Sequence, residues 1–524
     1  MRSLAGRLLL LWWRLVPKDG SNDRSHSFPR APHQVCRIVT MTTWSGVREV
    51  VEGPHQGPPT PGALRVGGNV NRRIAWGAAI VLFYAGAASA QSAASDRPSA
   101  PPPTTTETIS AKPAAPSPVT SKWATTFYGF VEADFISDST ESFNDLAGNA
   151  AIARPGTFPA GFKRLTFGVR NSRLGFRLGA PTYAGIKASA NVEMDFLGNQ
   201  PPNASEASFF TSPTFRIRHA LIKLESEYID VVIGQYWQLF GFQPYFHPNT
   251  VEMQGVPGQI YSRSPQLRLS HIFKTDTVSV EVAAAASRPP QRDSHIPDGQ
   301  AGIRFLLNSW KGVHTAGGAG TSADALAIGV SGVLRKFDVA EFSATPTTTV
   351  STTSNAYSID AFIPIIPSSM DDRGNALSFT GSFQNGSGTA DLYTGLSGGV
   401  AFPALPGGGT YTPNVDNGLA VFYSDGTLHT VDWRSYIVGL QYYLPPSGKI
   451  WVSGNFSQMY SGNALTFGAP SRIFDRSWWA DGNLFFDITP AVRTGLEYAY
   501  FHQTYGDGAN ASNHRFQLSA WYIF

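Results

Sequence analysis

The segment that most constrains the fold is the last eleven residues, 514–524, with the sequence HRFQLSAWYIF. Every second position is apolar, so a strand here has one continuous apolar face. An apolar face that ends in aromatic residues is typical of a lipid-facing β-barrel, in which the last strand closes the sheet and leaves no free edge. The apolar positions are Phe516, Leu518, Ala520, Tyr522 and Phe524.

The charge distribution argues against a nucleic-acid partner. The formal net charge is +3, but residues 1–90 hold 11 of the 40 Lys and Arg residues and 4 of the 37 Asp and Glu residues, so residues 91–524 carry 29 basic and 33 acidic side chains. They contain no run of Lys and Arg that could follow a phosphate backbone. They also contain no apolar stretch long enough for a membrane-spanning helix, which excludes a helical membrane protein.

Residues 71–90 are predicted to be a signal peptide. Arg72 and Arg73 precede the apolar run 74–85, and small residues at 88–90 are suited to cleavage after Ala90. A short buried helix is the alternative. Export of this kind places the mature protein in the Gram-negative cell envelope, and the barrel pattern indicates the outer membrane.

The regions on either side of the signal peptide have no globular pattern. Residues 1–70 are predicted to be a non-native or untranslated extension, with translation starting at Val66 or Val70; a genuine long extension is the alternative. Residues 91–124 are rich in Pro, Ala and Thr and predict an extended periplasmic linker. The one cysteine, Cys36, lies before the cleavage site, so no thiol is left for disulfides, catalysis or zinc.

Residues 125–524 are predicted to form an all-β, transmembrane antiparallel barrel. An even strand number suits a single-chain bacterial barrel, and sixteen segments have the period of two expected for strands. They lie at 127–136, 168–180, 185–197, 214–225, 229–238, 266–274, 276–287, 299–307, 325–337, 356–366, 376–386, 434–444, 449–460, 477–488, 491–503 and 514–524.

The connections between these segments alternate in length. Those at 445–448 and 489–490 are tight, whereas those at 137–163 and 388–433 are long. This alternation predicts short periplasmic turns and long extracellular loops, with both ends of the barrel domain on the periplasmic side. By their place in this alternation, the connections 308–323 and 367–375 should be tight periplasmic turns, but their sequences indicate long connections. Aromatic pairs at strand ends, such as Trp478-Trp479, Tyr442-Tyr443 and Trp521-Tyr522, are expected at the membrane interface, with cross-strand packing as the alternative.

The alternate, polar positions of the strands are predicted to face the lumen. Opposite charges on separate parts of a narrow wall create a transverse field that orients small polar solutes. The alternative is that these arginines are locked in salt bridges along the wall. Near His219 the apolar phase slips, which predicts a β-bulge. The predicted basic lining is Arg173, Arg177, Arg216, Arg218, Arg268 and Arg304, and the predicted acidic lining is Glu132, Asp134, Glu193, Asp195 and Glu281, with Asp481 and Glu497 in the same phase.

The connection 239–265 is too apolar for a free surface loop. Folded inward, it would narrow the channel and set its size limit; the alternative is that it latches over a neighbouring protomer. Its candidate constriction residues are Phe240, Tyr245, Glu252, Tyr261 and Arg263.

Several motifs resemble those of the DcaP-like porins of Gram-negative outer membranes. They are Ser172–Phe176, Phe215–Ala220, Ile233–Trp237, Arg263–Arg268, Gly495–Tyr498 and the closing strand. The resemblance implies a sixteen-stranded homotrimer that passes small, often anionic, hydrophilic solutes, with a third extracellular loop folded into the pore. It also implies that Arg173, Arg177, Arg216, Arg218 and Arg268 form the basic wall. Some DcaP-like porins carry a helical coiled coil before the barrel, where this chain has the Pro/Thr-rich linker.

An enzymatic function is not expected. The candidate histidines, His219, His271, His295 and His514, lie in no serine-linked motif, and neither a phosphate loop nor a zinc-spaced cluster is present. We therefore expect no catalytic residue, cofactor or metal. The expected function is passive diffusion of small polar solutes through a barrel embedded in outer-membrane lipid. The alternative is a surface-binding or adhesion barrel with a plugged lumen, in which residues 388–433 and 338–355 form the binding surface.

Overall fold

The computed structural model describes residues 123–199, 210–252, 256–289, 295–317 and 319–524. The predicted extension 1–70, the signal peptide with its cleavage site at Ala90, and the linker as far as residue 122 lie outside these residues. Within the described part of the chain, no helix is both long and apolar enough to cross a membrane.

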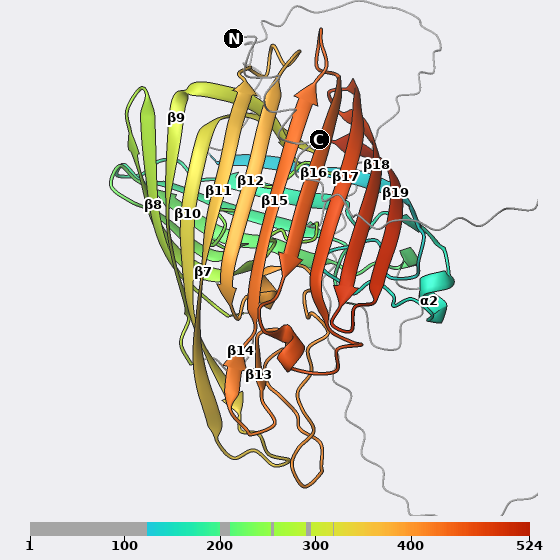
Figure 1. Cartoon of the computed structure of the whole chain (residues 1–524). Helices are drawn as coiled ribbons and strands as arrows, with labels where there is room; N and C mark the ends of the chain where they lie inside the picture. The colour runs from blue at the N-terminus through green and yellow to red at the C-terminus, as the bar shows by residue number, and fades with distance from the viewer. Residues whose placement is uncertain (1–122, 200–209, 253–255, 290–294, 318) are drawn as a thin grey trace, which may run out of the picture. The chain divides into compact units, whose positions relative to one another are not determined.

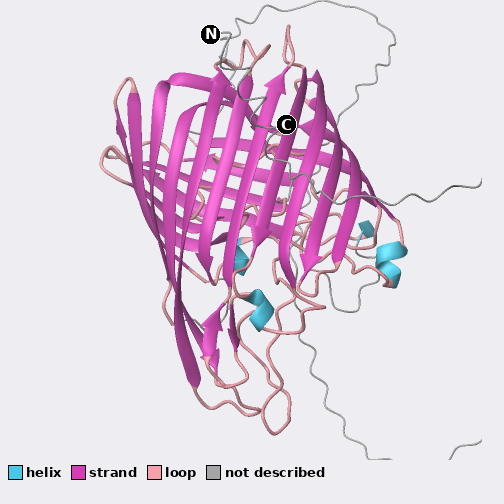
Figure 2. Cartoon of the chain, in the orientation of Figure 1, coloured by secondary structure: helices cyan, strands magenta, loops and turns pink. Residues whose placement is uncertain are grey.

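The described residues form a closed antiparallel β-barrel with sixteen strand positions (Figures 1 and 2). Neighbours in the sheet are neighbours in the chain, and β1 closes the ring by pairing with β19 from Phe130↔Ile523 to Asp138↔Arg515. One position is shared by two short strands, β2 and β3, which pair with different halves of β1. The wall strands are β1 (Ala124–Asp138), β2 (Arg164–Gly168), β3 (Arg173–Gly179), β4 (Lys187–Asp195), β5 (Arg216–Glu225), β6 (Asp230–Trp237), β7 (Arg263–Lys274), β8 (Val278–Ser287), β9 (Asp298–Ala316), β10 (Gly320–Ala340), β11 (Thr349–Ile366), β12 (Leu377–Ser387), β15 (Asp432–Tyr443), β16 (Ile450–Tyr460), β17 (Phe474–Thr489), β18 (Val492–Tyr505) and β19 (Asn510–Ile523).

All sixteen predicted segments are strands, but two predicted connections were wrong. Residues 308–323 are not a long loop, because β9 and β10 continue through them to a tight turn. Residues 338–355 are mostly strand as well, leaving only 341–348 as a loop. Apolar alternation fails at 338–355 because threonine and serine occupy the outward positions of β11, and at 308–323 because this hairpin leaves the lipid-facing wall. The ten-residue connection 367–376 is longer than the other periplasmic turns, as its sequence indicated.

Wall polarity is inverted relative to that of a water-soluble protein. On β19, Leu518 is 47% exposed, whereas the neighbouring Gln517 and Ser519 are buried inside the barrel. Leu440 on β15, Phe305 on β9 and Phe167 on β2 are exposed in the same way. An outward apolar surface with inward polar groups is stable when hydrocarbon surrounds the barrel, and it is the arrangement of an outer-membrane barrel.

The inner wall carries an aromatic cluster at the end where the short turns lie. Trp451 stacks on Phe485 with ring centroids 3.8 Å apart, and Tyr443 lies 5.3 Å from Trp451. Trp521 extends the cluster beside Phe485. Of the pair Tyr442-Tyr443, Tyr443 therefore fits the alternative of cross-strand packing, because adjacent strand residues face opposite sides of the wall.

Beyond the membrane, the long connection 388–431 forms a compact cap. It contains the short hairpin β13 (Ala420–Phe422) and β14 (Leu428–Thr430), which Figure 1 shows at the end opposite the short turns. Phe422 and Trp433 are buried with Phe337 of β10 in one apolar cluster. The short helices α2 (Phe158–Gly161), η1 (Ala390–Leu392) and η2 (Ala464–Thr466) lie in the loops at this end.

We predict that Leu518→Arg strongly destabilises the barrel. An arginine facing hydrocarbon near the bilayer midplane costs about 2–4 kcal/mol. Urea unfolding in lipid vesicles should show that loss. The matched control is Leu465→Arg, the same change at a similarly exposed leucine of η2 in a loop outside the wall, which should leave the free energy of unfolding nearly unchanged. Equal losses in both variants would contradict a lipid-facing Leu518.

Candidate functional site: the barrel lumen

The densest group of inward charges lies where β3, β4 and β5 adjoin. Asp195 of β4 accepts two hydrogen bonds from Arg216, at 3.0 and 2.6 Å. Arg218 is fully buried and bridges Glu193, at 2.7 Å, and Asp195, at 3.0 Å. Charge-assisted bonds of this length are among the strongest a side chain forms.

The predicted bulge near His219 is confirmed, and it explains how this group assembles. The β4–β5 register shifts so that Glu193 is opposite His219, while Met194 is opposite Ile217. Arg218 is the extra residue, and both it and His219 are buried on the inner side. Without the bulge, Arg218 and His219 would face opposite sides of the wall.

A fourth arginine joins the group from the start of β7. The Arg263 guanidinium lies 4.6 Å from the Trp237 ring and 5.1 Å from the Tyr261 ring. Its Nη1 is buried without a hydrogen-bond partner, and Arg263 forms no ion pair with any residue in the described ranges. Arg173 approaches Glu193 at 3.6 Å.

We call these six residues the arginine cluster. It contains four guanidinium groups and two carboxylates, so its local charge is positive. Its members are Arg173, Arg216, Arg218 and Arg263, with Glu193 and Asp195.

The three other predicted arginines lie apart from this cluster. Arg177 is exposed and stacks over Tyr128 at 4.1 Å, and Arg268 donates to the Trp237 carbonyl at 2.5 Å and to Gln266. Arg304 pairs with Glu281 at 2.6 Å and lies over the Tyr245 ring at 3.6 Å. The predicted arginines are thus divided between paired and unpaired positions.

Two predicted acidic residues are packed into the wall on β1. Glu132 is fully buried, and its backbone N–H donates to Ser172 Oγ at 2.9 Å. Asp134 accepts from Ser519 at 2.5 Å and from Asn171 at 3.2 Å. These bonds tie β1 to its two neighbouring positions in the ring.

The loop 238–262 between β6 and β7 is bound to distant inner walls. The Val251 N–H donates to Asn483 Oδ1 and to Glu497 Oε2, each at 2.9 Å, and the Glu252 N–H donates to the same Glu497 oxygen at 3.0 Å. Asn249 O accepts from Ser453, at 2.7 Å. Glu497 lies on β18 and Ser453 on β16, far round the ring from β6.

The first part of the same loop is anchored to β9 and β10. The Phe240 N–H donates to Gln300 Oε1 at 2.9 Å, and the Gly241 N–H donates to Ser331 Oγ at 2.8 Å. Phe240 and Glu252 are buried, whereas Tyr245 is 41% exposed. The apolar residues of this loop marked it as a candidate constriction in the sequence, whereas its amide and hydroxyl anchors, such as Gln300 and Ser331, were not predicted. The only sequence signal for these anchors is that amide and hydroxyl side chains occupy the inward-facing positions of the strands.

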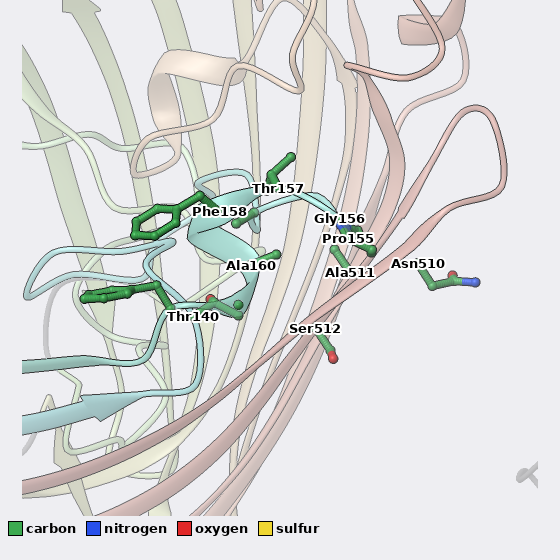
Figure 3. Close-up of a pocket in the computed structure, with 12 residues that line it drawn as sticks. Thr140, Pro155, Gly156, Thr157, Phe158, Ala160, Asn510, Ala511 and Ser512 are labelled. Atoms are coloured by element: carbon green, nitrogen blue, oxygen red, sulfur yellow. The ribbon is translucent and has the colours of Figure 1, made fainter.

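An open cavity of about 680 Å³ lies between the loop that carries α2 and the start of β19 (Figure 3). Residues 153–162 line one side and Asn510–Ser512 the other. Nearby, the exposed Arg154 donates to Asp507, and this hydrogen bond holds the pKa of Asp507 below its usual value. Among the described residues that line the cavity, none has a titratable side chain.

Fold and lumen together define a sixteen-stranded outer-membrane barrel of the porin type. The structure is similar to the outer-membrane channel DcaP of Acinetobacter baumannii, with a TM-score of 0.57 and 15% sequence identity over 77% of this chain and 97% of that chain. It is also similar to an anion-selective porin from Comamonas acidovorans, with a TM-score of 0.44 and 11% identity over 77% of this chain and all of that one. No protein-family model and no curated protein matches the sequence. The expected resemblance to DcaP-like porins is thus confirmed at the level of the fold.

We predict that Asp195→Asn destabilises the barrel by about 3–5 kcal/mol, because it removes a carboxylate from the buried Arg218 and from the partly exposed Arg216. Urea unfolding in vesicles measures this loss. Asp507→Asn breaks the exposed pair with Arg154 and serves as the control; its unfolding midpoint should not move, since exposed pairs contribute little. If Asp195→Asn unfolds at the same urea concentration as the wild type, the arginine cluster does not stabilise the barrel.

Proposed function

We propose that this chain is an outer-membrane porin through which small hydrophilic solutes, anions among them, diffuse passively. The proposal includes export by the signal peptide 71–90 with cleavage after Ala90, and assembly as a homotrimer in outer-membrane lipid. The closed wall with apolar outer and polar inner residues supports a water-filled path. The TM-score of 0.57 to a channel supports the same function.

The unpaired charge of Arg263 is the observation that best supports a preference for anions. Its guanidinium lies against the rings of Trp237 and Tyr261 and has a hydrogen-bonding nitrogen without a partner. Together with the paired Arg216 and Arg218, it gives the lumen a positive region beside loop 238–262. Such a region concentrates anions and repels cations in a narrow aqueous path.

Loop 238–262 is proposed to narrow the channel. Its backbone hydrogen bonds to Glu497 on β18 and Gln300 on β9 support an inward course, since both acceptors are buried on the inner face. The alternative, a latch over a neighbouring protomer, does not account for these bonds to the inner wall. The extent of the buried contacts predicts a restricted rather than a wide pore.

We predict that the purified protein produces stepwise ion currents in a planar lipid bilayer, with a reversal potential displaced toward anions under a KCl gradient. A total absence of current would contradict the porin and favour the adhesion barrel, whose binding surface would be the 388–431 cap.

Neutralising the unpaired charge should weaken that anion preference. Arg263→Gln should lower the ratio of anion to cation permeability roughly five- to ten-fold, because one charge roughly 7 Å away in water changes the local anion and cation concentrations about two- to three-fold each, in opposite directions. Arg173→Gln with Arg177→Gln should act in the same direction. Arg434→Gln is the control, since Arg434 is exposed and bonded to Asn385 and Tyr460. Unchanged reversal potentials in the lumen variants would contradict a role for the arginine cluster in selectivity.

A further inference from the structure

The β9–β10 hairpin separates from the barrel wall at its periplasmic end. Pairing of β9 with β8 stops at Leu307, and pairing of β10 with β11 stops at Ala327. Beyond these points the two strands form a ladder only with each other, after a register shift that leaves residues 308–310 without a partner on β10. Figure 1 shows this ribbon near the β9 label bending over toward β11 and β12.

The departing hairpin binds inward-facing residues of β12 and β15. The Thr315 N–H donates to Gln441 Oε1 at 2.9 Å, Gln441 Nε2 donates back to the Thr315 carbonyl at 3.1 Å, and the Thr315 hydroxyl lies 2.6 Å from Tyr443 Oη. Ser378 Oγ donates to the Val313 carbonyl at 2.7 Å. These partners are buried, whereas the alternate residues of β15 are exposed to lipid. The hairpin therefore lies on the inner side of the wall.

The β9–β10 hairpin also reaches strands on the far side of the ring. Arg493 Nη2, on β18, donates to Thr321 Oγ1 at 3.1 Å. In the sheet order, β18 is separated from β10 by five other strand positions. A ribbon that leaves the wall at β10 and bonds to β18 crosses the periplasmic mouth of the barrel.

The hairpin meets loop 238–262 inside the barrel. Gln441 Oε1, which accepts from Thr315, also accepts from Asn249 Nδ2 of the loop at 3.4 Å. Val313 and Val251 belong to one buried apolar cluster with Trp451. Segments from opposite ends of the barrel thus share a side chain and an apolar core.

We propose that the β9–β10 hairpin, residues 308–325, is a second constriction that sets the size limit of the channel from the periplasmic side. This inference rests on the proposed porin function. On its accessible side the hairpin carries Asp324, whose side chain is half exposed and lies 3.4 Å from His314. The passage would therefore present arginines beside the loop and a carboxylate at the hairpin.

The direct test removes the hairpin. Residues 308–325 are replaced by Asn-Gly, a two-residue turn suited to joining Leu307 to Leu326, which already face each other. Single-channel conductance should rise roughly two-fold or more, because conduction follows the width of the aqueous path. Liposome swelling should admit larger neutral sugars than the intact protein admits.

A second test keeps the hairpin intact. Asp324→Cys, in a Cys36→Ser background, is treated with a positively charged methanethiosulfonate. The added bulk should reduce the current if the hairpin borders the path. Asp425→Cys, at an exposed turn of the extracellular cap, is the matched control and should conduct equally before and after labelling.

The outcomes separate the two proposals. If the intact protein conducts, and neither hairpin removal nor labelling at 324 changes the current, the second constriction is overturned while the porin function stands. If the intact protein is silent and the shortened protein conducts, the hairpin is an obstruction and free diffusion through the intact protein is contradicted. If neither conducts, both proposals fail.

Discussion

The structure depends on closure of the backbone hydrogen-bond ladder. Hydrocarbon offers no partner to a free N–H or C=O group, so a sheet can cross a membrane only if its first and last strands pair. The β1–β19 register, from Phe130↔Ile523 to Asp138↔Arg515, meets that condition. Side chains then alternate across a wall with lipid on one side, which forces apolar residues outward and polar residues inward.

Inside the closed wall, burial of polar groups determines the remaining architecture. The bulge at Arg218 brings three of the arginine cluster's charges into contact on β4 and β5. Loop 238–262 satisfies its backbone donors with Glu497, Asn483 and Gln300, and the β9–β10 hairpin does so with Gln441. Inward amide and carboxylate side chains thus serve as attachment points for two segments that would otherwise leave buried donors unpaired. The pore is shaped by these attachments as much as by the number of strands.

Much of the fold could be predicted because period-two alternation is a local signal. It located all sixteen strands, and the phase slip near His219 located the bulge. It failed where the outward residues are no longer constrained by lipid, as in the Thr- and Ser-rich start of β11 and the Gly-rich tip of the β9–β10 hairpin. The site was less predictable, because phase shows which side chains face inward but not which of them meet. Sequence separation hides the Thr315–Gln441 contact, and the unpaired state of Arg263 depends on the neighbours assembled by folding.

The most direct test of the account is a spin-label scan of β19 in lipid vesicles, from residue 514 to 523, measuring collision with oxygen dissolved in the bilayer. Labels at 516, 518, 520 and 522 should collide with oxygen strongly, and labels at 515, 517, 519 and 521 weakly, because alternate residues face lipid and the packed interior. Uniform accessibility, or maxima at the odd-numbered positions, would contradict a closed barrel with an apolar outer wall.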